Sequence, residues 1–278
     1  DGRYLSVADL RERQVAKGMD RALQFGAGQA WATDVQATEP GESVGLTVYP
    51  MNERLRQWQA PGIAPGKGFD RAVARSGWAE DDDYLMLIGV RSGGKSLPNV
   101  GTLAAYERFG QRLITSDLVP LYPRSASPWR HSRVTVSIGG LGAGMNEGAE
   151  VLAQKAVAGG QLFSFVVNSA GHHRWIRLLY WKPSAYVLVV DRILLPHGQA
   201  DEASGGCTLG VNWRCAGQLL GIDHGLATLG FIDPDVEGRF HVEVSGGLQL
   251  RAETDSYPAL GAPEDTPPMA ELMLHGLL

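Results

Sequence analysis

Residues 89–96 read Gly-Val-Arg-Ser-Gly-Gly-Lys-Ser and match the spacing G-x-x-x-x-G-K-S of a phosphate-binding loop. They continue an apolar run, residues 84–90, that has the length of a buried strand and is too short for a core helix. In such a loop the backbone amides and Lys95 would hold phosphate oxygens. A second apolar run ends at Asp191, which could hold a magnesium ion. Together these residues are typical of nucleotide chemistry.

The same loop has another interpretation, in which it only joins two strands. A phosphate loop must open a helix, because the amides and the dipole of that helix hold the phosphates. Pro98 and Gly101 fall in what would be its first two turns. Proline costs roughly 3 kcal/mol in a helix interior. The elements in the rest of the chain must therefore decide between a nucleotide site and a turn.

Composition excludes some classes of partner. The 278 residues carry a net charge of −5 and no run of lysine or arginine, which argues against nucleic-acid binding. No apolar stretch reaches the roughly 20 residues of a membrane-spanning helix, so no membrane contact is expected. The chain starts at Asp1, without an initiator methionine or a signal sequence, and we expect it to be a fragment or a processed product.

The two cysteines, Cys207 and Cys215, lie in one short apolar segment. If this segment is a strand, eight steps of about 3.3 Å place the thiols too far apart for a disulfide. The spacing also differs from the Cys-x-x-Cys pairs of zinc sites. We expect two free, buried thiols, and cysteine usage leaves the compartment open.

From residue 72 onward, the alternation of apolar runs and turn residues predicts a β protein. In this part, strands are predicted at residues 73–78, 84–90, 103–109, 134–138, 162–168, 175–181, 186–193, 207–214, 227–232 and 240–244. One short strand, at residues 45–49, is predicted before it. The clearest hairpin joins two of these runs through residues 182–185, Lys-Pro-Ser-Ala. After Asp117, only residues 149–158 are predicted as a helix. Strands and helices thus do not alternate as they do in a nucleotide-binding α/β domain.

The N-terminal part has a different pattern. A cap at Ser6 and apolar residues at near-helical spacing predict one helix over residues 7–25. Residues 31–68 are rich in glycine and proline and predict a linker. We therefore predict a large antiparallel β-sandwich preceded by a short helical segment. The helical segment would occupy residues 1–34 and the sandwich residues 35–278.

Several segments resemble, in order and spacing, the C-terminal β-sandwich domain of heparinase II/III-like polysaccharide lyases. Residues 175–192 are similar to the family's W-x-R…W…Y-h-h-V-h-D segment, residues 75–78 (Arg-Ser-Gly-Trp) to its R-S-G-W segment, and residues 131–136 to its H-N-x-V segment. The likeness covers roughly residues 45–217. It implies that the helix at residues 7–25 ends a preceding α/α-toroid domain, and that the protein is secreted or periplasmic.

The chain departs from the family where the resemblance implies chemistry. Family members carry a G-H-x-H-x-D-type loop, which supplies a catalytic histidine and groups near a divalent metal such as zinc or calcium. Here residues 94–99 read Gly-Lys-Ser-Leu-Pro-Asn, without either histidine or the acid. Asp117 (or Ser116) and His131 match two metal-holding positions. Because zinc usually takes three or four protein ligands, we expect the metal to be lost and no cofactor to remain.

The reaction that the resemblance implies is β-elimination from a uronic-acid polysaccharide. One group neutralises the sugar carboxylate, a base removes the adjacent ring proton, and an acid protonates the leaving oxygen. Lys95 is a candidate for pairing with the carboxylate, the alternative being a solvated loop lysine. His131 is a candidate for polarising the substrate, the alternative being a structural histidine.

Other polar and aromatic residues are candidates for binding sugar. Asn99 is a candidate substrate-binding residue, and Tyr122 and Arg124 lie in a proline-rich loop that would line a groove. Trp129, Trp175 and Trp181 would either stack on sugar rings, with Trp129 the substrate-binding candidate, or fill the core. His172 and His173, followed by Arg174, resemble a metal or acid–base cluster, but adjacent residues entering a strand point to opposite faces, so the two rings are not expected to serve one site.

The sequence is compatible with three functions. The first is elimination of acidic polysaccharides by the full-length protein; this chain alone would be inactive, because part of the family's catalytic residues come from the toroid. The second is a non-catalytic sandwich that binds or scaffolds acidic glycans. The third is nucleotide binding through Lys95.

Overall fold

The computed structural model describes most of the chain between residues 44 and 277. The described residues are 44–79, 81–90, 100–115, 132–138, 141–142, 148–169, 173–194, 207–231, 238–243, 249–254 and 270–277. The predicted helix at residues 7–25 and the boundary between residues 34 and 35 lie outside these ranges.

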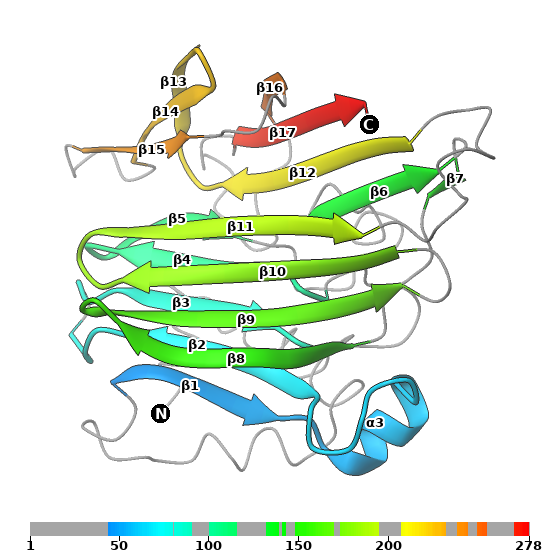
Figure 1. Ribbon diagram of the computed structural model, residues 1–278. Coiled ribbons are helices and arrows are strands. Elements are labelled where there is room, and N and C mark those ends of the chain that lie inside the picture. Colours follow the sequence, from blue (N-terminus) through cyan, green and yellow to red (C-terminus); the bar gives the residue numbers. More distant parts are fainter. Residues whose placement is uncertain are drawn as a thin grey trace, which may run out of the picture.

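The strands form three sheets (Figure 1). The first has the order β1-β2-β3-β4-β5-β12-β17-β16, with β6 attached to β12 and β7 to β6. Its strands are β1 (Gly45–Pro50), β2 (Phe69–Arg75), β3 (Tyr84–Ile88), β4 (Leu103–Arg108), β5 (Gln111–Thr115), β6 (Val134–Ile138), β7 (Leu141–Gly142), β12 (Cys207–Cys215), β16 (Gln249–Thr254) and β17 (Ala270–Leu277).

The second sheet has the order β11-β10-β9-β8 and the third the order β13-β14-β15. Their strands are β8 (Ala149–Val157), β9 (Gly160–Ser169), β10 (His173–Lys182), β11 (Tyr186–Leu194), β13 (Gln218–Asp223), β14 (Leu226–Gly230) and β15 (Arg239–Glu243). All strand pairs among the described residues are antiparallel. The predicted mainly-β, antiparallel sandwich is therefore confirmed.

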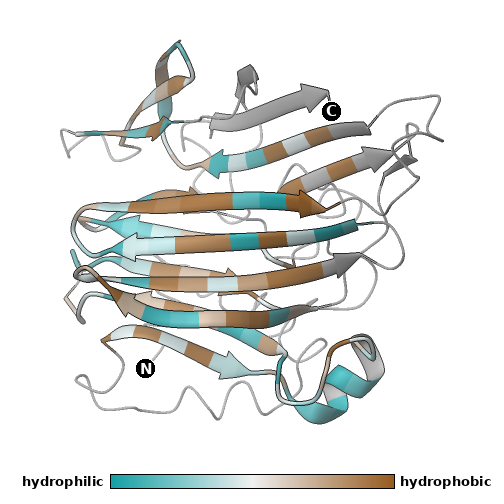
Figure 2. Cartoon of the chain, viewed as in Figure 1, coloured by the Kyte–Doolittle hydropathy of each residue, from teal (hydrophilic) through white to brown (hydrophobic). Residues whose placement is uncertain are grey.

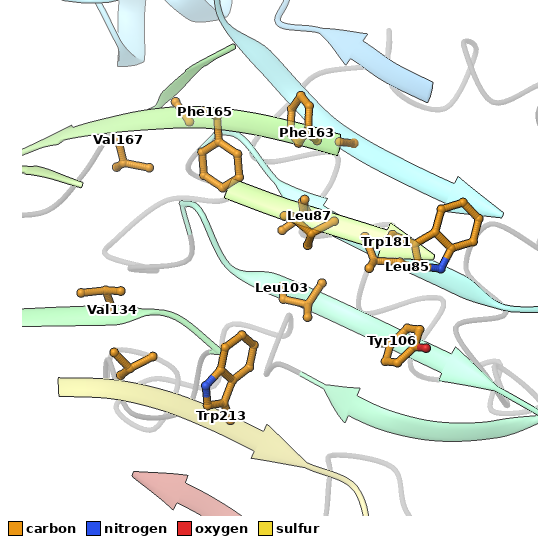
Figure 3. Close-up of a cluster of buried hydrophobic side chains, with 14 of the residues drawn as sticks. Leu85, Leu87, Leu103, Tyr106, Val134, Phe163, Phe165, Val167, Trp181 and Trp213 are labelled. Carbon is orange, nitrogen blue, oxygen red and sulfur yellow. The ribbon is translucent and has the colours of Figure 1, made fainter. Parts of the chain in front are cut away.

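The core lies between the first and second sheets. Phe69 of β2 packs edge-on against Phe163 and Phe165 of β9, with ring centroids 5.2 and 5.3 Å apart. Figure 3 shows Leu85, Leu87 and Leu103 of the first sheet in the same cluster as the aromatic side chains of the second. Burial of these large apolar groups is the main force that holds the sheets together.

The hairpin β10–β11 forms as predicted, in unbroken register from Arg174–Leu194 to Lys182–Tyr186. Along β10 every second residue is buried, as expected for a strand with one face on a core. Trp175 and Trp181 are on the buried face, each 1% exposed, so both belong to the core and do not form a sugar platform. Figure 2 shows apolar stretches on all four strands of this sheet, interrupted by hydrophilic residues.

The predicted helix at residues 149–158 is wrong, because most of this segment is strand β8. Its alanine, glutamate, glutamine and lysine residues favour a helix locally. Pairing with β9 along its length overrides that preference. The two strands meet at a two-residue turn, in which Ala158 and Gly159 both have positive φ (47° and 76°). This is the backbone conformation of a tight hairpin turn.

The predicted linker at residues 31–68 is also more ordered than expected in its described part. After β1, helix α3 (Glu53–Gln59) is capped by Asn52, whose side chain accepts a hydrogen bond from the Arg54 amide.

Strands β5, β7, β8, β13, β16 and β17 were not predicted as strands. Short polar segments such as β5 (QRLIT) carry too few apolar residues to be recognised without their partners.

The structure does not support the nucleotide-binding interpretation. Residues 91–99 lie outside the described residues, but the strands on either side, β3 and β4, are antiparallel neighbours. A phosphate loop instead lies between a strand and a helix beside a parallel sheet. The proposed magnesium ligand, Asp191, does not fit that role either, because its carboxylate forms a bidentate ion pair with Arg177.

Candidate functional site

All the predicted site residues lie outside the described residues. These are Lys95, Asn99, Asp117, Tyr122, Arg124, Trp129 and His131. They fall in two segments, residues 91–99 and 116–131. The structure does describe the residues at which these segments leave and rejoin the first sheet.

The first segment leaves after β3 and returns before β4. The Gly101 amide donates to the Ile88 carbonyl at 2.8 Å, and the Ile88 amide donates to the Thr102 carbonyl at 3.1 Å. These hydrogen bonds close the base of the segment that contains Lys95 and Asn99.

The second segment leaves after β5 and returns before β6. The Ser132 hydroxyl donates to the carbonyl of Thr115 at 3.1 Å, so the residues that flank the segment are in contact. The Ser132 carbonyl in turn accepts from the Leu103 amide at 3.1 Å. Leu103 is the first residue of β4, and both segments therefore start from the same end of the first sheet.

Arg177, on the inner face of β10, joins the two bases. Its Nη1 donates to the carbonyl of Gly101 at 3.0 Å and to that of Ser132 at 3.1 Å. Its Nε and Nη2 donate to the two oxygens of Asp191 at 2.8 and 2.9 Å, and the Trp175 indole donates to the same carboxylate at 2.7 Å. We call this group of five residues the Arg177 anchor.

The Arg177 anchor is held on several sides. The Arg177 side chain is fully buried and lies over the rings of Trp175 and Trp213, 4.7 and 5.3 Å from their centroids. A buried ion pair of this kind is maintained only where its geometry and remaining hydrogen bonds are good. Both conditions are met here, so the positions of the two segment bases relative to each other are fixed.

The surroundings of the anchor are rich in positive charge. Arg133 and Arg214 are buried, 7% and 0% exposed. Burial, with a smaller contribution from the neighbouring charge of Arg177, lowers the pKa of Arg133 to about 10. The charge of the third guanidinium, that of Arg177, is compensated by the Asp191 carboxylate. Arg177 itself is too buried to contact a ligand.

Other predicted ligands and motifs have structural roles where they are described. His173 is buried and its neighbour Arg174 is exposed, which confirms that adjacent residues here point to opposite faces. In the Arg-Ser-Gly-Trp motif, the Arg75 guanidinium lies between the rings of Trp78 and Tyr84, 4.8 and 4.5 Å from their centroids. Cys215 is a buried free thiol at the opposite end of β12 from Cys207, as expected for one strand.

The described residues contain neither a cluster of metal-binding side chains nor a membrane-spanning helix. No group of three or more histidine, cysteine, aspartate or glutamate side chains could hold a metal ion there. The predicted pair Asp117 and His131 stays a prediction. No helix in the described part of the chain is long and apolar enough to span a bilayer.

No protein-family model matches the chain, and no curated protein matches it significantly. Solved structures do match. A mutant of heparan sulfate lyase HepC from Pedobacter heparinus aligns with 96% of this chain and 39% of its own, at a TM-score of 0.61 and 13% identity. A heparinase III structure aligns with 77% of this chain and 34% of its own, at a TM-score of 0.54 and 14% identity. The structure of a heparinase III gene product aligns with 96% of this chain and 39% of its own, at a TM-score of 0.59 and 12% identity. The fold is heparinase III-like.

This heparinase III-like chain spans 34–39% of the length of those structures. The resemblance stated from the sequence is thus confirmed at the level of the fold. One of the segments that carried it, residues 175–192, contains three residues of the Arg177 anchor, Trp175, Arg177 and Asp191. Sequence reasoning noticed these residues but missed their role. The available signal was a tryptophan and an arginine two positions apart on one face of a strand, with an aspartate in the partner strand.

Proposed function

We propose that this chain is the β-sandwich part of a polysaccharide lyase-like protein that acts on uronic-acid polysaccharides by β-elimination. The main support is the Arg177 anchor. It brings to one end of the sheet the bases of both segments in which all the candidate site residues occur. The heparinase III-like fold supports the same reaction class, and a polysaccharide of the glycosaminoglycan type would be the substrate.

In this proposal each candidate residue has a role that its chemistry allows. Lys95 pairs with the sugar carboxylate and makes the adjacent ring proton more acidic. His131 exchanges a proton with the substrate at neutral pH, since an unperturbed histidine titrates near pH 6.5. Asn99, Tyr122, Arg124 and Trp129 bind the flanking sugars.

The reaction would need more of the protein than this chain. The matched structures are about two and a half times as long, and we expect the remaining catalytic groups to come from the part that this chain does not span. The chain alone should then bind an acidic glycan without cleaving it. A protein acting on such glycans would be secreted or periplasmic.

Ultraviolet absorbance of the unsaturated product tests the proposal. The full-length natural protein and this chain would each be incubated with heparan sulfate, heparin, hyaluronan and alginate. We expect product from at least one polymer with the full-length protein and none with the chain. Lys95→Ala in the full-length protein should reduce kcat/KM at least tenfold. Lys155→Ala, at an exposed position of β8, is the matched control and should have no effect.

A second candidate is a sandwich that binds acidic glycans without cleaving them. The observation in its favour is the sequence of residues 94–99, which has neither histidine of the family loop. Absence of product from all four polymers with the full-length protein would contradict the lyase proposal. If binding of a heparan sulfate oligosaccharide persisted in that case and was weakened by Lys95→Ala, the second candidate would replace the first.

A further inference from the structure

A cleft of about 580 Å³ lies between the second and third sheets, and Asp191 of the Arg177 anchor is one of its lining residues. All five residues of β15 line it, and so do residues from both faces of β11, such as Leu188 and Val189. A cleft lined by both faces of a strand runs along the edge of that strand. In Figure 1, β15 is drawn above the left part of β11.

Both strands that border the cleft are the last strands of their sheets. β11 ends the order β11-β10-β9-β8, and β15 ends the order β13-β14-β15. Within the described ranges, neither pairs with another strand on its second side. β11 contains nine residues in unbroken register with β10, with no proline and no bulge. Natural proteins usually protect an edge of this kind, because its free backbone groups pair readily with another strand.

The floor of the cleft is apolar. It is formed by the inner face of the first sheet, including Leu103, Leu113, Val134, Val211 and Trp213. Inward-pointing side chains of a strand lying between β11 and β15 would rest on this floor, and its alternate side chains would face solvent.

The charged groups of the cleft do not form an acidic-sugar site. Arg108 donates to the carbonyls of Ala185 and Ser184, and Asp191 is bound to Arg177. Arg239 and Glu243 are exposed on β15 and have opposite signs. The lining therefore offers strand edges and an apolar surface. It has no excess of positive charge that would bind a polyanion.

We propose that this cleft binds an extended segment of a partner protein, which adds as a strand between β11 and β15 and joins the second and third sheets. The segment would have apolar residues at alternate positions and polar residues between them. Main-chain hydrogen bonds would provide affinity, and the apolar floor would select the alternating pattern. This binding is independent of the proposed elimination reaction.

Fluorescence anisotropy with a labelled heptapeptide tests the proposal. The probe alternates valine with threonine, lysine and glutamate. One control peptide has the same composition with the valines in a block, and a second has proline at two of the polar positions, which removes amide donors without changing the apolar residues. We expect saturable binding of the alternating peptide to the whole chain, and at least tenfold weaker binding of both controls.

Two further measurements locate the binding. Adding the alternating peptide should slow amide exchange in β11 and β15 of the unaltered protein. Val242→Lys places an inward charge at the edge of β15 and should weaken binding about tenfold or more. Leu220→Lys, at a 56% exposed residue of β13 that does not line the cleft, is the matched control and should bind normally.

Several results would overturn the proposal. Equal binding of the proline peptide would show a nonspecific apolar site, and displacement of the peptide by a heparan sulfate oligosaccharide would show a glycan site. A chain that sediments as a dimer, and becomes monomeric with Val242→Lys, would make a second copy the occupant. Absence of binding by all three peptides, with unchanged amide exchange, would exclude strand addition.

Discussion

At the scale of single residues, Gly101 shows how closely the segment bases are packed. Its φ is +78°, and a Cβ at this position would lie 2.6 Å from Cζ3 of Trp175. Gly101→Ala therefore combines backbone strain with overpacking against a rigid ring, and we expect a loss of about 2–4 kcal/mol in the free energy of unfolding. Urea denaturation measures it. Gly159→Ala is the control, because Gly159 has a similar φ (+76°) and open space around it. It should cost only about 1 kcal/mol.

Arg177 should be among the most sensitive polar residues of the chain. Arg177→Met removes the cationic partner of Asp191, which keeps only the hydrogen bond from the Trp175 indole, and one donor each from the Gly101 and Ser132 carbonyls. Removing one partner of a buried ion pair costs about 3–5 kcal/mol. Denaturation gives the loss, and amide exchange at Leu103, which bonds to Ser132, should accelerate. Glu53→Gln, which breaks the solvent-exposed Arg56–Glu53 pair, should have a much smaller effect, because surface ion pairs contribute little to stability. Equal effects of the two changes would contradict a structural role for the anchor.

Tyr106 makes the stability of the protein sensitive to alkaline pH. Burial and, to a smaller extent, the charge of Asp83 raise the pKa of its hydroxyl from 10.0 to about 12. Below pH 10 the hydroxyl is protonated in both states. Between pH 10 and 12 the unfolded state ionises first, so stability falls as pH rises. Tyr106→Phe should make this fall less steep when denaturation is followed across that window. An unchanged slope would show that Tyr106 is not the group responsible.

Sequence reasoning found residues of the anchor but could not find the anchor itself. Trp175, Arg177 and Asp191 were recognisable because side chains two apart in a strand share a face, and because a hairpin places Asp191 opposite Arg177. The other two partners are backbone carbonyls, at Gly101 and Ser132. A carbonyl has no sequence signature, and only the tertiary fold determines which ones lie near an arginine.

At the scale of elements, β8 shows where local preference and tertiary structure disagree. Its sequence favours a helix, and the turn that follows uses Ala158 at φ 47° instead of the usual glycine or asparagine. Ala158→Gly should relieve the strain and stabilise the protein by roughly 0.5–1 kcal/mol. Thermal or urea denaturation tests this. Ala156→Gly, in the strand itself, should instead destabilise it, since glycine weakens a strand interior. Destabilisation by both changes would show that the turn is not strained.

At the scale of the whole molecule, strand order was the least predictable feature. Hairpins such as β10–β11 can be recognised locally, because their strands are neighbours in sequence. The pairing of β12 with β5, β6 and β17 joins segments that are far apart in the chain. That pairing depends on which apolar faces meet in the core. No local sequence pattern indicates which distant segments these are.

The shared core also predicts how the molecule unfolds. One hydrophobic cluster contains Leu85 of the first sheet, Phe163 of the second and Leu229 of the third, each fully buried. Because no sheet keeps its apolar face covered without the others, we expect a single cooperative transition. Near-ultraviolet circular dichroism, which reports Trp175 and Trp181 packing between the sheets, should give the same midpoint as the far-ultraviolet signal. A strand that fills the cleft between β11 and β15 should raise both midpoints together. Two separate midpoints would show instead that the third sheet unfolds independently of the sandwich.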